Sequence, residues 1–215
     1  MKKYILLVIT GIITLHALGG DIDYAVNKIP ASLLVNANVV KRYEDIRFEV
    51  VSLDKAKYYQ KVAYTVLNEK GDKVAHCMEQ YDKLQSVESI EGRLFDETGK
   101  KIRSLKQADI QDISGTDEGS LADDNRIKYH NFHHKAYPYT VEYEVAIRFN
   151  YTMFYPGWIP LEDEGISMEY GKMTVVLPEG IDFRYKAFNL KDNPVITTQK
   201  SSKLYHLGTQ RFCCY

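Results

Sequence analysis

Residues 137–151 constrain the fold of this chain more than any other segment. From Val141 to Tyr151, apolar or aromatic residues alternate with polar ones, and Glu142 and Glu144 begin the polar set. A two-residue period places the two sets on opposite faces of a strand. The segment therefore predicts a long, half-buried antiparallel β-strand, with one face in a core and the other toward solvent.

Shorter alternating segments recur along the chain, and turn-forming residues separate them. Residues 68–72 and 96–100 carry the glycine, asparagine and aspartate that favour tight turns. Further strands are expected at residues 47–51, 59–67, 73–81, 87–95, 101–105, 126–132, 167–177 and 181–188, and from residue 203. No segment keeps a helical period, so the pattern predicts an all-β fold, namely an antiparallel β-sandwich.

The first twenty residues have the features of a secretory signal peptide. Lys2 and Lys3 form a short positive region, an apolar stretch follows, and Ala17 and Gly19 supply small residues before the cleavage site. The apolar stretch is too short to span a bilayer comfortably, and an uncleaved membrane anchor is the alternative. We therefore expect a signal peptide at 1–20, no membrane span after its cleavage, and a secreted or periplasmic location.

Composition argues against several classes of function. The formal net charge is -1, without the basic excess typical of nucleic-acid-binding proteins, so no nucleic-acid partner is expected. The cysteines are Cys77, Cys213 and Cys214. An odd number with an adjacent pair at the end does not indicate a disulfide framework. Cys77 lies in an alternating segment, so we expect a small buried side chain and not an exposed nucleophile.

Three histidines and a run of acidic residues are the candidates for a metal site. His130 and His133 would point to opposite faces of a strand, and zinc would need a third ligand beside His130 and His134. The acidic residues at 109–125 match no calcium-loop spacing. The sequence also lacks the motifs of serine hydrolases and metalloproteases. We therefore expect no metal, no cofactor and no catalytic residue.

Residues 151–160 combine aromatic residues with two prolines and contain the only tryptophan of the chain. Phe154, Tyr155 and Trp158 are the candidate binding residues, because exposed aromatic side chains can stack on sugars or anchor a protein partner. The alternative is that Phe154 and Trp158 close the end of the core, since large aromatic side chains are mostly buried. Both interpretations remain open from the sequence.

Several motifs carry a resemblance to a known family. They are residues 36–40, 66–71, 96–102 and 109–114 and, above all, Tyr-Pro-Tyr-Thr-Val-Glu-Tyr-Glu at 137–144. Over residues 31–205 the chain resembles the domain of unknown function 3857, the amino-terminal module of many secreted bacterial proteins that continue into a transglutaminase-like domain. The resemblance implies a β-rich, sandwich-like fold and a transglutaminase-like partner domain in longer relatives. It supplies no catalytic residue.

These observations together predict an organisation and a function. A signal peptide at 1–20 precedes one β-sandwich domain at 21–205, and residues 206–215 form an irregular tail that we interpret as a frameshift product. The expected function is that of a non-catalytic module that contacts a partner domain, a protein or a glycan. One alternative is a truncated fragment of a transglutaminase-like enzyme without its catalytic domain. Another is a free-standing carbohydrate-binding module that uses Tyr155 and Trp158.

Overall fold

The computed structural model describes residues 22–115, 124–181, 183–188, 194–199 and 202–212, so the expected signal peptide lies outside the described residues. The strands are β1 (Val39–Ser52), β2 (Lys55–Val66), β3 (His76–Tyr81), β4 (Gln85–Phe95), β5 (Lys101–Ser104), β6 (Gln111–Ser114), β7 (Arg126–Asn131), β8 (Tyr139–Phe149), β9 (Ile166–Pro178), β10 (Val195–Gln199) and β11 (Ser202–Phe212). The 3-10 helices are η1 (Val26–Lys28), η2 (Ala31–Leu33), η3 (Glu69–Val74) and η4 (Gln107–Asp109).

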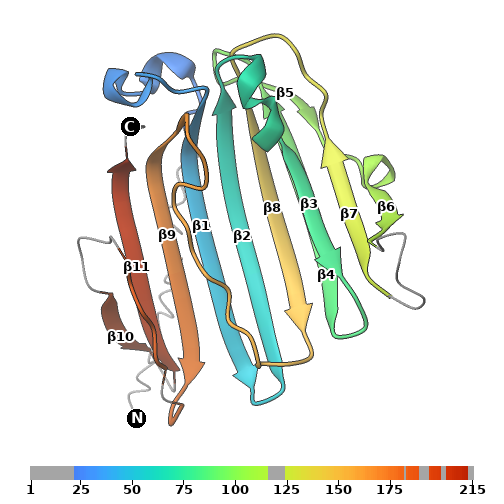
Figure 1. The fold of residues 1–215 in the computed structure, drawn as a ribbon, viewed down its shortest axis with the longest axis vertical. Coiled ribbons are helices and arrows are strands. Elements are labelled where there is room, and N and C mark those ends of the chain that lie inside the picture. Colours follow the sequence, from blue (N-terminus) through green and yellow to red (C-terminus); the bar gives the residue numbers. More distant parts are fainter. Residues whose placement is uncertain (1–21, 116–123, 182, 189–193, 200–201, 213–215) are drawn as a thin grey trace, which may run out of the picture.

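Two sheets of unequal width make up the fold. The large sheet has the order β10-β11-β9-β1-β2-β8-β4-β5, and the small one has the order β3-β7-β6 (Figure 1). The β-rich class is confirmed, but the large sheet is mixed and not purely antiparallel, because β1 and β9 run parallel. Two parallel strands that pair must be joined by a long connection, and here that connection includes every element between β1 and β9. Local alternation carries no information about such a connection.

β8 confirms the long alternating strand. It pairs antiparallel with β2 and with β4, and its apolar residues, such as Val141 and Ile147, are buried. The other face departs from the prediction at Glu142, whose side chain is also buried. Tyr24, from the segment before β1, covers the Glu142 side chain, and its hydroxyl donates a hydrogen bond to the Glu142 carboxylate. A distant part of the chain thus covers a side chain that local alternation places in solvent.

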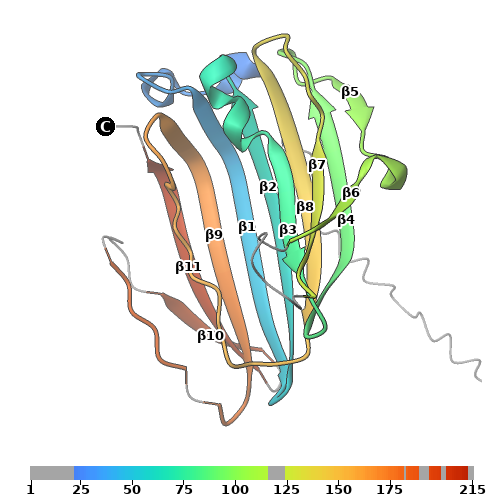
Figure 2. The ribbon, with the colours of Figure 1, turned by 45° about the vertical axis from the view of Figure 1, so that its right-hand side comes forward.

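The small sheet packs on one part of the large sheet and buries a shared core. Cys77 of β3 and Phe132, just after β7, meet Ile90, Leu94 and Tyr143. Figure 2 shows β3, β6 and β7 as a second layer over β4 and β8. Cys77 is therefore a buried side chain, as predicted, and burial raises the pKa of its thiol to about 12.

The family-like Tyr-Pro-Tyr motif anchors the start of β8. The Asp72 carboxylate, in η3, accepts hydrogen bonds from the hydroxyl of Tyr137 at 2.6 Å and that of Tyr139 at 2.9 Å. Lys135 also donates to it. Burial alone would raise the pKa of Asp72, but these donors hold it below its ordinary value. The motif is therefore a structural device that ties η3 to the large sheet.

The segment at residues 181–188 is not the predicted strand. Its described residues form no strand, and the rings of Phe183 and Tyr185 instead pack against Tyr205 of β11. Alternation indicated one apolar face correctly, but a strand also needs a partner for its backbone. In this segment, contacts between aromatic side chains, and not backbone hydrogen bonds to a neighbouring strand, hold the chain against the sheet.

Residues 206–212 differ from the irregular tail that the sequence predicted. They continue β11, which pairs antiparallel with β9 as far as Phe212. The other edge of β11 pairs with β10. Residues 213–215 lie outside the described residues. The start of β11, expected from residue 203, is confirmed, and it is flanked by a strand on each side.

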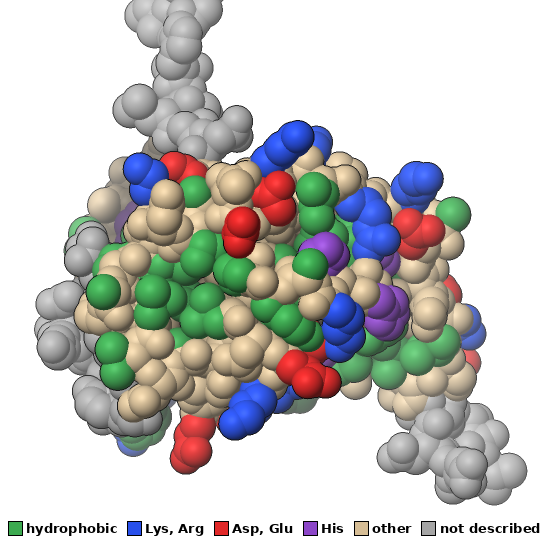
Figure 3. Space-filling model, turned by 90° about the horizontal axis from the view of Figure 1, so that it is seen from above, with side chains coloured by type: hydrophobic (Ala, Val, Ile, Leu, Met, Phe, Trp, Pro, Cys, Tyr) green, Lys and Arg blue, Asp and Glu red, His purple; other side chains and the backbone are tan. Residues whose placement is uncertain are grey.

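One end of the molecule is closed by short helices. Ile29, Leu33 and Val40 are buried together beneath η1 and η2, while Leu34 and Val35 are exposed. Figure 3, which views this end, shows a group of hydrophobic side chains near the middle and histidines beside basic side chains to the right of it. Among the described residues, no helix is both long and apolar enough to cross a membrane.

Candidate functional site

The segment between β8 and β9 forms one wall of an apolar groove on the large sheet. It runs along the sheet in front of β1 and β9 (Figure 1). The groove has a volume of about 600 Å³, and residues 155–160 line one side. Met173 and Val175 of β9 and Leu207 of β11 lie at its base, and residues 183–188 line the opposite side.

Trp158 belongs both to the groove and to the core. The half-buried ring packs against a cluster that includes Phe48 and Met173. Its Nε1 donates a hydrogen bond of 2.8 Å to Glu44 Oε2. An indole N–H that is partly buried normally needs such an acceptor. The groove wall is therefore held against the sheet through this side chain.

A buried polar cluster beneath the segment fixes its position. Lys41 and Glu44 of β1 are each 1% exposed, and Lys41 Nζ lies 3.4 Å from the Glu44 carboxylate. Lys41 also donates to the Pro160 carbonyl at 3.1 Å, and Gln60 donates to Glu44 at 3.2 Å. Because a buried charge is costly without partners, this cluster favours one position of the segment.

The three candidate binding residues are only partly brought together. Tyr155 and Trp158 line the same groove, and the Tyr155 ring lies edge-on to Phe48 at 5.2 Å. Phe154 does not line the groove, and it is 71% exposed. Tyr155 and Trp158 are therefore both packed and accessible, whereas Phe154 is a largely exposed side chain whose ring lies 6.3 Å from that of Tyr151.

The sequence interpretation missed the opposite wall of the groove, which it assigned to a strand. Phe183 belongs to this opposite wall, and its ring lies 5.5 Å from that of Tyr155 and 5.3 Å from that of Tyr205. Arg184 and Lys186 alternate with the aromatic residues of this wall. The alternation of aromatic with basic residues was the available signal.

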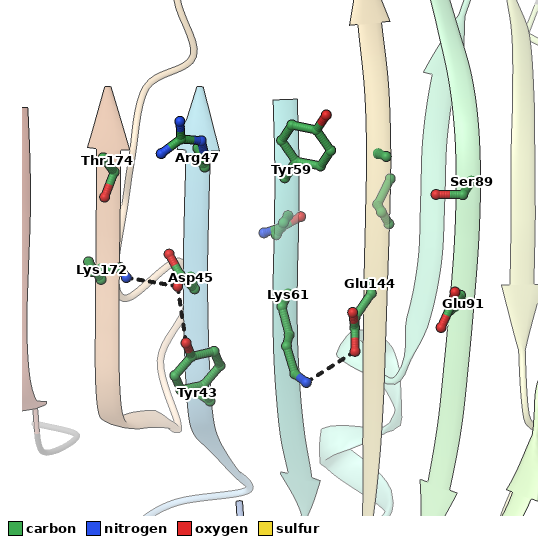
Figure 4. Close-up of a pocket in the computed structure, with 13 residues that line it drawn as sticks. Tyr43, Asp45, Arg47, Tyr59, Lys61, Ser89, Glu91, Glu144, Lys172 and Thr174 are labelled. Atoms are coloured by element: carbon green, nitrogen blue, oxygen red, sulfur yellow. Dashed lines mark hydrogen bonds and ion pairs between the residues drawn. The ribbon is translucent and has the colours of Figure 1, made fainter. Parts of the chain in front are cut away.

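A second hollow, of about 510 Å³, lies on the other face of the large sheet (Figure 4). Its charges face one another across the strands: Lys172 lies 2.9 Å from Asp45, and Lys61 lies 3.0 Å from Glu144. Burial alone would raise the pKa of Glu144, but Lys61 and Arg93 keep it below its ordinary value. These charges already have partners within the protein, so the hollow offers little to a charged ligand.

Cys77 and His130 are the nearest approach to a catalytic pair. They are cross-strand neighbours between β3 and β7, but His130 Nδ1 pairs with the Tyr143 hydroxyl at 2.9 Å. Burial raises the pKa of the thiol and lowers the pKa of the imidazole. A nucleophilic cysteine needs a thiolate beside a basic or cationic group. The neutral, buried pair does not supply one.

The remaining histidines do not converge with His130. His133 has a positive φ of 52°, and the His134 ring lies 5.0 Å from the ring of Tyr139. Over the described ranges, no group of three or more histidine, cysteine, aspartate or glutamate residues could hold a metal ion.

The motifs of β8 and the two-sheet architecture can be compared with known families. The family model of the domain of unknown function 3857, a family with a solved structure, matches residues 54–207. The chain belongs to this family. The match spans the region from the turn before β2 into β11, so it contains both walls of the groove.

Comparison with solved structures supports the fold. A protein described as a putative protease from Parabacteroides distasonis superposes with a TM-score of 0.68 at 10% identity, over 83% of this chain. The match covers 36% of that protein, so this chain spans little more than a third of its length. An M1 zinc metallopeptidase from Deinococcus radiodurans gives a TM-score of 0.36 at 7% identity, covering 80% of this chain and 39% of that one. Comparison with curated proteins found no similar sequence.

Proposed function

We propose that this domain is a secreted or periplasmic, non-catalytic module that contacts a polypeptide partner through the face bearing the groove. The observation that carries the proposal is the apolar surface around the groove. Ile159 is 65% exposed, Phe188 70% and Tyr185 44%. Soluble proteins seldom leave large apolar side chains exposed side by side unless another molecule covers them.

The chemistry of the side chains supports contact over catalysis. The thiol of Cys77 is buried with a raised pKa, and its neighbour His130 is engaged by Tyr143. The described residues that line the groove are apolar or basic, and none of them carries a carboxylate. General acid–base or nucleophilic chemistry at neutral pH needs a titratable group poised in the site. The groove is therefore better suited to binding.

A second candidate is a role as the β-rich accessory part of a larger protease-like protein. It is favoured by the structural match to the Parabacteroides protein, about two-thirds of which lies outside the match. In that case the partner would be a companion domain, for which the transglutaminase-like domain implied by the family resemblance is the candidate. The same groove face would then be the contact with that domain.

Site-specific photocrosslinking in the cells that produce the protein tests the contact. The photoreactive amino acid p-benzoylphenylalanine replaces Ile159 beside the groove or, as a matched control, Tyr59 on the opposite face, which is 38% exposed. We expect a crosslinked polypeptide from position 159 and none from position 59, because only the groove face is proposed to be covered. Mass spectrometry identifies the crosslinked chain.

The possible outcomes separate the alternatives. No product from position 159, or equal yields from both positions, would contradict the proposed contact. A glycan attached at position 159 would favour a carbohydrate-binding module instead. A second domain of the same polypeptide as the crosslinked product would select the accessory role in a larger protein.

A further inference from the structure

We propose that the groove receives an extended, apolar polypeptide segment that carries an acidic side chain. The proposal rests on the contact function proposed above and adds the chemistry of the partner. Three features of the described residues carry it: the apolar walls, the lack of backbone–backbone hydrogen bonds in one wall, and basic side chains without an acidic partner in the other.

The size and lining of the groove suit a short segment of chain. Its volume of about 600 Å³ lies within the range of roughly 300–1,000 Å³ typical of sites that enclose small ligands. Tyr155 and Trp158 on one side, and Phe183 and Phe188 on the other, present rings to the interior. Rigid aromatic walls bind apolar side chains with little loss of conformational entropy.

The first wall also offers backbone groups to a ligand. Among the described residues, no backbone–backbone hydrogen bond involves residues 155–159. Gly157 has no Cβ, and the space where one would stand is open. Unpaired N–H and C=O groups along an extended segment are satisfied best by another extended chain. This feature favours a polypeptide over an acyl chain, which has no such groups.

The second wall supplies positive charge that no described acidic side chain pairs. Arg184 and Lys186 line the groove and are exposed. Among the described residues, no acidic side chain forms an ion pair with either one, and none lines the groove. Lys186 Nζ lies 4.7 Å from the centre of the Phe188 ring, so its charge stays beside an apolar surface. Charge complementarity therefore selects a partner with an acidic side chain.

Fluorescence of Trp158 provides a direct test, because it is the only tryptophan in the chain. The probes are two blocked five-residue peptides with leucine or phenylalanine at alternate positions and glutamate or lysine at the centre. We expect the glutamate peptide to change the emission and to bind about tenfold more tightly than the lysine peptide. The double variant Arg184→Gln/Lys186→Gln should remove this preference. Arg47→Gln, on the opposite face, is the matched control and should retain it.

Each outcome bears on the proposal. Equal affinities for the two peptides, or an unchanged preference in the double variant that urea denaturation shows to be folded, would overturn the acidic specificity. Tighter binding of dodecanoate than of the glutamate peptide would overturn the polypeptide ligand. If neither peptide binds but position 159 crosslinks a partner, this inference fails and the contact function stands. If the peptides bind as expected without crosslinking in cells, the contact function fails separately.

Discussion

At the scale of single residues, Trp158 links the groove to the core. Its ring lines the groove, while its N–H donates to the buried carboxylate of Glu44. Phe154, four positions earlier, is 71% exposed and lies outside the groove lining. The two aromatic residues of one segment therefore have different relations to the fold, and their substitution should separate packing from surface exposure.

We predict that Trp158→Ala costs about 3 kcal/mol in the free energy of unfolding, because it removes a large packed ring and a hydrogen bond to a buried charge. Phe154→Ala should cost less than about 0.5 kcal/mol, as is usual for surface substitutions. Urea denaturation of the two variants and the wild type measures both. Equal losses for the two variants, or no loss for Trp158→Ala, would contradict this assignment.

At the scale of elements, the segment between β8 and β9 depends on the ion pair below it. Lys41 is paired with Glu44 and donates to the carbonyl of Pro160, and both charged residues are 1% exposed. Removal of one partner leaves the other charge buried without a counter-charge, which is strongly destabilising. The segment between β8 and β9 forms no strand and so makes no strand-to-strand hydrogen bonds. The polar cluster holds it against the sheet instead.

We predict that Lys41→Met lowers the free energy of unfolding by about 3–5 kcal/mol, because the Glu44 carboxylate loses its buried counter-charge. The double variant Lys41→Met/Glu44→Met should cost less than the sum of the two single variants, since Lys41→Met leaves Glu44 without its buried counter-charge and Glu44→Met leaves Lys41 only the mostly exposed Glu162 at 3.6 Å. Arg47→Met is the control: it breaks the exposed pair with Glu49 and should cost less than about 1 kcal/mol. Strictly additive losses in urea denaturation would show that the ion pair is uncoupled.

The small sheet contributes a titratable group to the hollow between the two sheets. Glu79 of β3 lines this hollow, which has a volume of about 360 Å³ and also contains Cys77 and Tyr64. Burial raises the pKa of Glu79 to about 7 from the ordinary value of 4.5. Between these values the folded protein keeps a proton that the unfolded chain has released. Stability must therefore fall as the pH rises through this window.

We predict that, between pH 4.5 and pH 8, the free energy of unfolding of the wild type falls by on the order of 1–3 kcal/mol relative to that of Glu79→Gln. The reason is that only the wild type has a buried carboxyl that must either keep its proton or ionise as the pH rises. At pH 8 the variant should be the more stable protein, and at pH 4 the two should be nearly equal. Urea denaturation across this pH range measures the difference. A difference that is independent of pH would show that Glu79 titrates as an exposed carboxyl.

At the scale of the whole molecule, the amino-terminal segment is part of the folded domain from its first described residues. The guanidinium of Arg42 donates to the Asp23 carbonyl at 3.0 Å and to the Tyr24 carbonyl at 3.3 Å. Tyr24 is 3% exposed and covers Glu142 of β8. Asp23 and Tyr24 lie directly after the expected cleavage site, so cleavage there would leave these contacts intact.

We predict that the exported protein begins at Gly20 or Asp21, because the small residues Ala17 and Gly19 lie where signal peptidase cleaves. The intact mass of protein recovered from the periplasm or the medium of a bacterial host measures this directly. Retention of residues 1–19 in that protein would contradict the prediction and would favour the uncleaved anchor.

Features governed by neighbouring residues could be read from the sequence. The two-residue period identified β8, and the position of Cys77 within such a period indicated its burial. The aromatic segment at 151–160 was recognised as a candidate site, and Tyr155 and Trp158 do line the groove. In each case the deciding physics is local, because side-chain direction follows from strand geometry and apolar side chains favour burial.

Other features were decided only by contacts between distant parts of the chain. The parallel pairing of β1 with β9 brings together strands separated by most of the domain. The burial of Glu142 depends on Tyr24, and the second wall of the groove depends on the contact of Phe183 with Tyr155 and Tyr205. Local periodicity specifies which face of a strand is apolar, but not which distant segment covers it. The sequence pattern therefore determined most of the long strands, whereas the loss of the strand expected at 181–188, the mixed sheet and the groove depended on tertiary packing.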